Sequence, residues 1–212
     1  MTKRYKVQEI YYTLQGEGFY TARPAIFCRF VGCNLWSGKE KDRPKASCRF
    51  CDTNFLGMTG PNGGTYTAKD LIQKIQTLWT FSKSPFVVFT GGEPLLQLDL
   101  PLVEACKKQN FFVAVETNGT KEIPDGIDWI CISPKPRSQI VVPKASELKL
   151  VFPQPEEEMH PRFFENFDAE HHYLQPLDNE QLHANTELAS NFCKENPKWK
   201  LSIQTHKFLQ LP

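Results

Sequence analysis

The segment Phe86-Val-Val-Phe-Thr-Gly-Gly-Glu-Pro94 decides the fold class of this chain. Its first four residues form a short, continuous apolar run, and a polar, glycine-rich stretch follows at once. A continuous apolar run of this length is typical of a strand covered on both faces, as in a parallel sheet. The segment therefore predicts a buried strand that ends in a polar loop.

The same pattern recurs along the chain. Further strands are predicted at 7–13, 25–31, 111–115, 129–132, 148–152, 172–174 and 200–203, and helices from 67 to about 80, from 99 to about 110 and over 180–196. If the strands are parallel, the polar loops after them gather at one rim, where α/β proteins place their active sites. The chain is shorter than the roughly 250 residues of a full eight-unit barrel. We therefore expect an α/β fold with a partial (βα) barrel or an open, mostly parallel sheet.

Length and composition describe one folded domain over residues 1–212, without a repeat or a linker. The chain holds 25 Lys and Arg against 24 Asp and Glu, and 40% of its residues are hydrophobic. A balanced charge lacks the positive field that nucleic-acid binding needs, which favours a small, non-polymeric ligand. No segment approaches the roughly 18 apolar residues of a membrane span, so we expect a cytoplasmic protein without membrane contact.

Three of the seven cysteines lie in a long polar loop at about 32–64, which contains Cys33, Cys48 and Cys51. Three thiolates can hold three corners of a [4Fe-4S] cluster and leave the fourth iron open to another ligand. Adding Cys28 gives four thiolates instead, a plausible zinc ribbon and hence a binding module. The spacing of the cysteines alone does not distinguish the cluster from the zinc site. Strand alternation favours the cluster, because Cys28 shares its face with Ile26 and Phe30 and is expected in the core.

The remaining cysteines are expected to pack. Cys106 lies in a predicted helix, Cys131 in a predicted buried strand and Cys193 on the apolar face of its helix. Free cysteine is commonly buried as a small apolar residue. None of the three is therefore expected at a functional site.

Together, the three loop cysteines and Gly-Gly-Glu-Pro94 resemble the radical S-adenosylmethionine (SAM) superfamily, whose Gly-Gly-Glu-Pro segment contacts the amino group of SAM. Two glycines let backbone approach a ligand, and Glu93 offers a carboxylate to an ammonium. The Cys-x14-Cys-x2-Cys spacing departs from the usual Cys-x3-Cys-x2-Cys. The branch that shares it is the 7-carboxy-7-deazaguanine synthase family, which the chain resembles over nearly its whole length. The matches include Tyr12-Thr-Leu-Gln-Gly-Glu-Gly18, Cys48-Arg-Phe-Cys-Asp-Thr53, Glu116-Thr-Asn-Gly119 and Gln204-Thr-His-Lys207.

This resemblance implies a radical SAM lyase in queuosine (7-deazapurine) biosynthesis. Such an enzyme converts 6-carboxy-5,6,7,8-tetrahydropterin to 7-carboxy-7-deazaguanine and releases ammonia. A 5′-deoxyadenosyl radical removes the hydrogen at substrate C6, SAM is reused, and Mg²⁺ assists. The remaining alternative is a radical SAM enzyme of another substrate, such as a glycyl-radical activase, which should have the short cysteine loop.

The resemblance also implies a role for particular residues. Cys33, Cys48 and Cys51 would hold the cluster, and Thr53 would bind Mg²⁺, although without the resemblance it would simply cap a turn. The residues implied for SAM are Gly91, Gly92, Glu93, Glu116, Ser133, Pro134, Lys135, Gln175, Pro176, Leu177 and Asp178. Those implied for the pterin are Leu14, Gln15, Gly16, Glu17, Arg29, Thr90, His206 and Pro212. Among the latter, Arg29 suits the substrate carboxylate and Glu17 the guanidine-like edge. Small members of the family form homodimers, and the cluster needs an electron donor of the flavodoxin or ferredoxin type.

Overall fold

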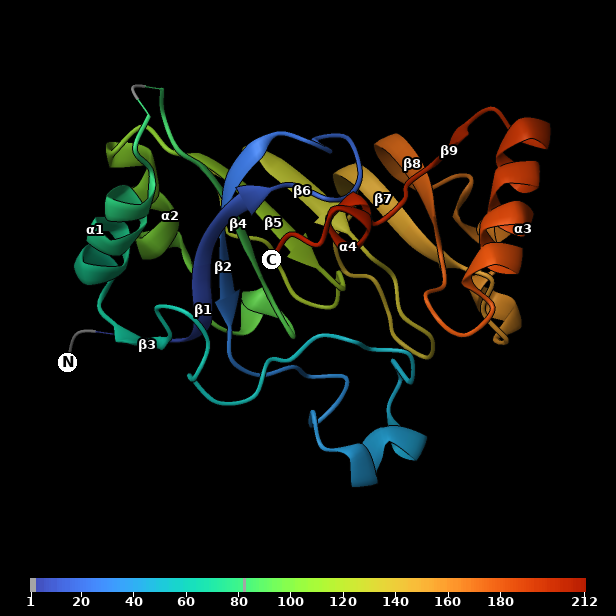
Figure 1. Cartoon of the computed structure of the whole chain (residues 1–212), viewed down its shortest axis with the longest axis horizontal. Coiled ribbons are helices and arrows are strands. Elements are labelled where there is room, and N and C mark those ends of the chain that lie inside the picture. Colours follow the sequence, from blue (N-terminus) through green and yellow to red (C-terminus); the bar gives the residue numbers. More distant parts are fainter. Residues whose placement is uncertain (1–2, 82) are drawn as a thin grey trace.

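Strands from both halves of the chain join into one open sheet (Figure 1). The computed structural model describes residues 3–81 and 83–212, and within them the strand order is β3-β1-β2-β4-β5-β6-β7-β8-β9. The strands are β1 (Tyr5–Leu14), β2 (Pro24–Phe30), β3 (Gly64–Tyr66), β4 (Phe86–Gly91), β5 (Phe112–Thr117), β6 (Trp129–Ile132), β7 (Lys144–Phe152), β8 (Asp168–Pro176) and β9 (Trp199–Leu201).

The sheet is parallel from β2 through β9, and β1 pairs antiparallel with both β2 and β3. The ends of this order, β3 and β9, do not pair with each other, so the sheet stays open. The predicted α/β fold with an open, mostly parallel sheet is confirmed. Several strands are longer than predicted: β1 covers Tyr5–Leu14, and β7 and β8 pair from Lys144 and Asp168 to Phe152 and Pro176.

Helices α1 (Ala68–Leu78) and α2 (Leu100–Lys108) lie beside one end of the sheet, and α3 (Leu182–Glu195) lies beside the other (Figure 1). The starts of α1 and α2 follow local sequence, since the side chains of Thr67 and Asp99 accept bonds from the backbone N–H groups of Asp70 and Leu102. A short helix, α4 (Thr205–Leu209), forms where a polar loop is expected. The 3-10 helices are η1 (Glu40–Lys45), η2 (Pro94–Leu96), η3 (Glu157–Met159) and η4 (Pro161–Phe164).

The two faces of the sheet differ. On one face, alternate strand residues such as Ile26 and Cys28 form a large core with α1 and α2, and a second core forms under α3. The other face carries a smaller aromatic cluster near the starts of the strands, including Phe27 and Phe86. Further along the same strands and on this face, polar side chains such as Arg29 and Thr90 replace the aromatic ones. Strand alternation thus places a polar surface at the carboxyl ends of the parallel strands.

The loop between β2 and β3 hangs below the sheet in Figure 1, with η1 at its tip. It has a small core of its own, made of Trp36, Ala46 and Phe55, against which Cys33 and Cys51 pack. Arg43 of η1 donates to the carbonyl oxygen of Cys51 at 3.0 Å and stacks over the Trp36 ring. Of the helices in the described ranges, none has the length and hydropathy to cross a lipid bilayer.

Candidate active site

A cleft of about 460 Å³ opens where the polar face of the sheet meets the long loop. Its volume falls in the range of small-molecule sites. The carboxyl ends of β4, β5 and β8 line it from the sheet, the loop with the cysteines lines a second side, and residues around α4 line a third. Segments from the beginning, the middle and the end of the chain therefore share one cavity.

Cys33, Cys48 and Cys51 all line this cleft. The backbone N–H of Leu35 donates to the sulfur of Cys33 at 3.4 Å. The Cys48 thiol donates to Cys51 and lowers the pKa of Cys51 to about 6, while the same bond raises the pKa of Cys48. Three thiols with amide donors around them fit a [4Fe-4S] cluster, whose sulfurs accept such bonds.

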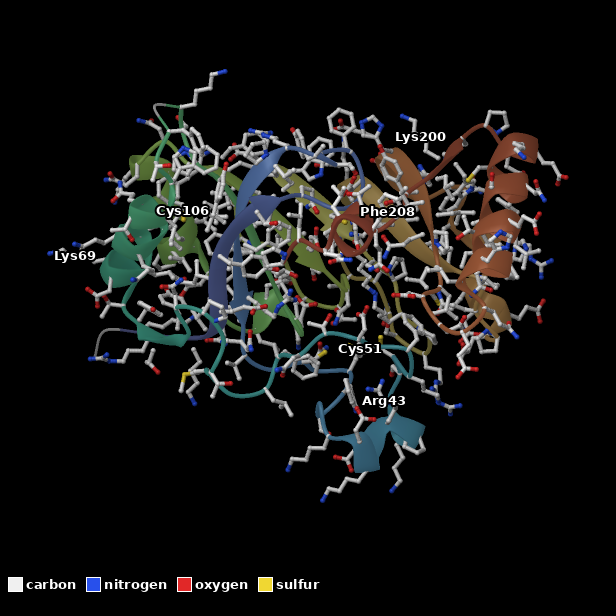
Figure 2. The ribbon with its side chains drawn as sticks, in the orientation of Figure 1. Arg43, Cys51, Lys69, Cys106, Lys200 and Phe208 are labelled. Carbon is white, nitrogen blue, oxygen red and sulfur yellow. The ribbon has the colours of Figure 1, made fainter. Side chains whose placement is uncertain are left out.

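Two of the other cysteines, Cys28 and Cys106, lie away from the cleft. Cys28 is fully buried in the core under α1 and α2, on the opposite side of the sheet from the cleft. Cys106 belongs to the same core, and Figure 2 shows it well apart from Cys51. Within the described ranges, the His, Cys, Asp and Glu side chains form no group of three close enough for a single metal ion.

Gly91, the last residue of β4, and Gly92 bring the backbone against the loop that carries the cysteines. The N–H of Glu93 donates to the carbonyl oxygen of Gly32 at 2.9 Å, and a Cβ on Gly92 would lie 2.4 Å from that same oxygen. Gly91 and Gly92 both line the cleft, and so does Gln175 of β8, whose buried Oε1 has no partner among the described residues. A backbone cradle and an unpaired amide oxygen fit a ligand with polar groups, such as SAM.

Two expected SAM residues, Glu93 and Pro134, do not line the cleft. Glu93 is fully buried, and its carboxylate accepts from the Leu95 and Asn118 N–H groups and from the Thr117 hydroxyl at 2.8 to 2.9 Å. It therefore ties η2 to the end of β5, and a contact of Glu93 with SAM stays a prediction. Pro134 lines a separate pocket with Ser138 and Phe164.

A carboxylate cluster occupies the polar face between β5 and β8. Glu17 accepts from the amides of Gln175 at 3.2 Å and Gln204 at 2.8 Å, and it forms an ion pair with Lys149. Glu116 accepts from Gln15 at 3.0 Å. Despite the desolvation that raises it, the pKa of Glu17 falls to about 2, mainly because of the Lys149 ammonium.

Arg29 and His206 border the same space. The Nε of Arg29 donates to Glu9 at 2.8 Å and an Nη donates to the Tyr11 hydroxyl at 3.3 Å, which fixes the guanidinium at the cleft wall. The His206 ring packs over Gly16, where an added Cβ would lie 2.0 Å from Nδ1. Only glycine leaves room for the ring in this position.

The segment that contains α4 runs across the cleft and connects its sides. Thr205 donates to the Gly16 carbonyl oxygen, and the Pro212 carbonyl oxygen accepts from the Thr13 hydroxyl at 3.1 Å. Lys207 bridges Asp52 at 2.6 Å and Asp178 at 2.5 Å. These ion pairs join the loop of the cysteines to the end of β8.

Comparisons with known proteins identify the family. Residues 44–131 match the model of the Radical SAM superfamily. A 7-carboxy-7-deazaguanine synthase from Burkholderia multivorans is 50% identical over 98% of this chain and 99% of its own length, and one from Caulobacter vibrioides is 52% identical with the same coverage. The chain belongs to the 7-carboxy-7-deazaguanine synthase family. The crystal structure of QueE from Escherichia coli agrees, with 26% identity and a TM-score of 0.72 over 95% of this chain and 94% of that one.

Membership of the 7-carboxy-7-deazaguanine synthase family makes the chain a radical SAM enzyme, whose cofactors are a [4Fe-4S] cluster and SAM. The family resemblance inferred from the sequence is confirmed. The zinc-ribbon alternative is wrong, because Cys28 lies in the core on the far side of the sheet.

For this family member, most of the residues expected at the site do line the cleft. All the expected substrate residues, the three loop cysteines and Thr53 line it, and so do the expected SAM residues apart from Glu93 and Pro134. Sequence reasoning missed Lys149 and Gln204, which line the cleft, and Glu147, which lines a smaller neighbouring pocket. It also assigned Cys131 to packing, whereas Cys131 lines the cleft and bonds to Glu147. Period-2 alternation from Leu148 and Leu150, both in the core, could have placed Glu147 and Lys149 on the polar face.

Proposed function

We propose that this enzyme converts 6-carboxy-5,6,7,8-tetrahydropterin to 7-carboxy-7-deazaguanine with release of ammonia, acting as one domain over residues 1–212. One observation carries the proposal. A single cleft is lined by Cys33, Cys48 and Cys51, by the Gly92 backbone and by the side chains of Glu17 and Arg29. The cleft thus has three thiolate ligands for the cluster and a backbone segment that can approach SAM. It also has one acidic and one basic side chain, which suit the guanidine-like edge and the carboxylate of this pterin.

In this proposal the protein binds, orients and encloses the reactants. When bound, the cluster and SAM supply the radical that removes the hydrogen at substrate C6. Arg29, held by Glu9, presents N–H groups to the substrate carboxylate, and Glu17 accepts from the N–H groups of the guanidine-like edge. His206 and the segment around α4 cover these residues and limit the access of water.

The direct test is an anaerobic incubation of the reconstituted protein with 6-carboxytetrahydropterin, SAM, Mg²⁺ and dithionite. Formation of the deazapurine, detected by absorbance and mass, is the expected result. SAM cleavage without the deazapurine would instead favour a radical SAM enzyme of another substrate. Glu17→Gln is the matched variant, since it keeps the shape of the side chain and should make product more slowly at low substrate concentration.

We further propose that Thr53 binds Mg²⁺ through its hydroxyl, with substrate oxygens and water completing the shell, as is usual for this ion. Thr53 lines the cleft two residues after Cys51, and its N–H donates to the Cys51 sulfur. Thr53→Ala is expected to keep the cluster, lower turnover at least about tenfold and remove the response to Mg²⁺. Thr53→Ser, which keeps the hydroxyl, is the control. A Thr53→Ala enzyme still activated by Mg²⁺ would exclude this role.

The proposal also includes two protein partners. An acidic, flavodoxin- or ferredoxin-like donor would fit the exposed basic side chains of Lys39, Lys41, Lys45 and Arg49 around the cysteine loop. Reduction of the cluster by such a donor should slow as salt rises, and a salt-independent rate would argue against this site.

A second copy of the chain would cover apolar side chains near α4, of which Phe208 is 87% exposed, and Figure 2 shows Phe208 in this region. Sedimentation of a Phe208→Asp variant should give a monomer. An unchanged dimer would place the interface elsewhere.

A further inference from the structure

Lys149 of β7 lies on the polar face of the sheet and is only 5% exposed, although lysine is rarely buried so deeply. Its Nζ forms an ion pair with Oε2 of Glu17 and lies 3.8 Å from Oε1 of Glu116. Taking an ammonium out of water is costly unless carboxylates compensate it. A stabilising role for the fold alone would be met as well by an apolar residue, so the position favours a role in the cleft.

The carboxylate of Glu17 is held from different elements. Gln175 of β8 and Gln204, next to α4, both donate to its Oε1. Its Oε2 pairs with Lys149. Since the two amides hold one oxygen, the orientation of the other depends on the ammonium. The same ammonium lies beside Glu116, which Gln15 holds from the other side at 3.0 Å.

We infer that Lys149 is a positioning residue for the substrate: its buried ammonium holds the Glu17 carboxylate and directs it into the cleft. The inference rests on the proposed function, because Glu17 would there accept from N–H groups of the pterin. Lys149 acts through Glu17 and does not itself need to touch the reacting atoms. It also lies within 3.8 Å of Glu116 and so places both carboxylates around one ammonium.

The charges around Glu17 give the sign of the pH dependence. The titratable groups around Glu17 and its partner Lys149 come from β5, β6, β7 and α4 and are Glu116, Cys131, Glu147 and His206. Burial raises the pKa of Glu17, and Lys149 is the main group opposing that rise. Without Lys149, Glu17 takes up a proton at low pH and loses its acceptor. Binding by a Lys149→Met variant should therefore strengthen as the pH rises, whereas binding by the wild type stays constant.

The experiment measures binding of 6-carboxypterin, an oxidised substrate analogue, to the reconstituted enzyme with SAM, over about pH 5.5 to 7.5. Lys149→Met is expected to weaken binding by about ten- to a hundredfold at the low end, with recovery toward the high end. Lys144→Met, on the exposed start of the same strand, is the matched control and should bind like the wild type. Lys149→Met combined with Glu17→Gln should bind no more weakly than Glu17→Gln alone.

The possible outcomes distinguish a failure of the inference about Lys149 from a failure of the proposed function. Wild-type binding and turnover together with unchanged, pH-independent binding by Lys149→Met would overturn the role of Lys149 alone. A wild type that forms no deazapurine would overturn the proposed function instead. If Lys149→Met loses its cluster or its fold, the test is binding by the double variant, because that variant removes both charges of the pair. Weaker binding by the double variant than by Glu17→Gln would show that Lys149 does not act through Glu17.

Discussion

Cys51→Ala is expected to abolish both the cluster and turnover, whereas Cys28→Ala keeps both. Cys51 lines the cleft with Cys33 and Cys48, and the loss of one thiolate leaves only two corners of a [4Fe-4S] cluster attached. Cys28 lies in the core, so its truncation removes a small buried side chain and costs about 1 kcal/mol of folding free energy. The two variants therefore separate a ligand from a packed cysteine.

Iron and sulfide analysis after anaerobic reconstitution measures this difference directly. About four irons per chain are expected for the wild type and for Cys28→Ala, and far fewer for Cys51→Ala. Thermal unfolding of the three proteins checks that Cys51→Ala is folded. Full iron content in Cys51→Ala, or its loss in Cys28→Ala, would contradict the assignment of the cluster to the loop.

Gly92→Ala is expected to lower SAM cleavage by about a hundredfold or more. The added Cβ would lie 2.4 Å from the carbonyl oxygen of Gly32 and 2.6 Å from the Cβ of Cys33. One of these atoms belongs to the backbone, and the other is the first side-chain atom of a cluster cysteine. Neither can swing away, as the end of a flexible side chain could, so the clash remains. The two sides of the cleft must move apart, and the distance between the cluster and SAM must change with them.

Gly57→Ala serves as the control, because an added Cβ there has nothing within 4 Å. Its positive φ of 70° makes alanine somewhat unfavourable, so a small loss of stability without a loss of activity is expected. Formation of 5′-deoxyadenosine with dithionite reports the effect, and equilibrium dialysis reports SAM binding. Activity of Gly92→Ala within about threefold of the wild type would show that the close approach is unimportant.

The sequence predicted those helices and strands whose formation depends mainly on residues within the same segment. The run from Phe86 to Phe89 is covered on both faces, as its composition requires, and the helix predicted from residue 67 begins there, with Thr67 as its cap. The start of β7 was missed, because Lys144 and Glu147 interrupt the apolar pattern and become a strand through pairing with β8. Helix α4 is too short to be stable alone. It forms where the chain packs against Gly16, a contact that sequence spacing does not reveal.

The candidate site was predictable as a set of segments but not as a set of side-chain directions. The motif around Gly92 placed the backbone at the cleft, yet Glu93 points into the protein, because the ends of β5 and η2 supply donors to it. Lys149 was overlooked since a lysine in a strand is normally exposed. Its burial depends on Glu17, which lies far away in the sequence.

The bond between Thr13 and the carbonyl oxygen of Pro212 has a practical consequence for anyone who produces this enzyme. Any residue appended after Pro212, including an affinity tag, would begin beside the substrate cavity, which Pro212 itself lines. Histidines in such a tag could also compete for iron during reconstitution. Assays are therefore best performed on protein whose purification handle has been fused to the opposite terminus or cleaved off.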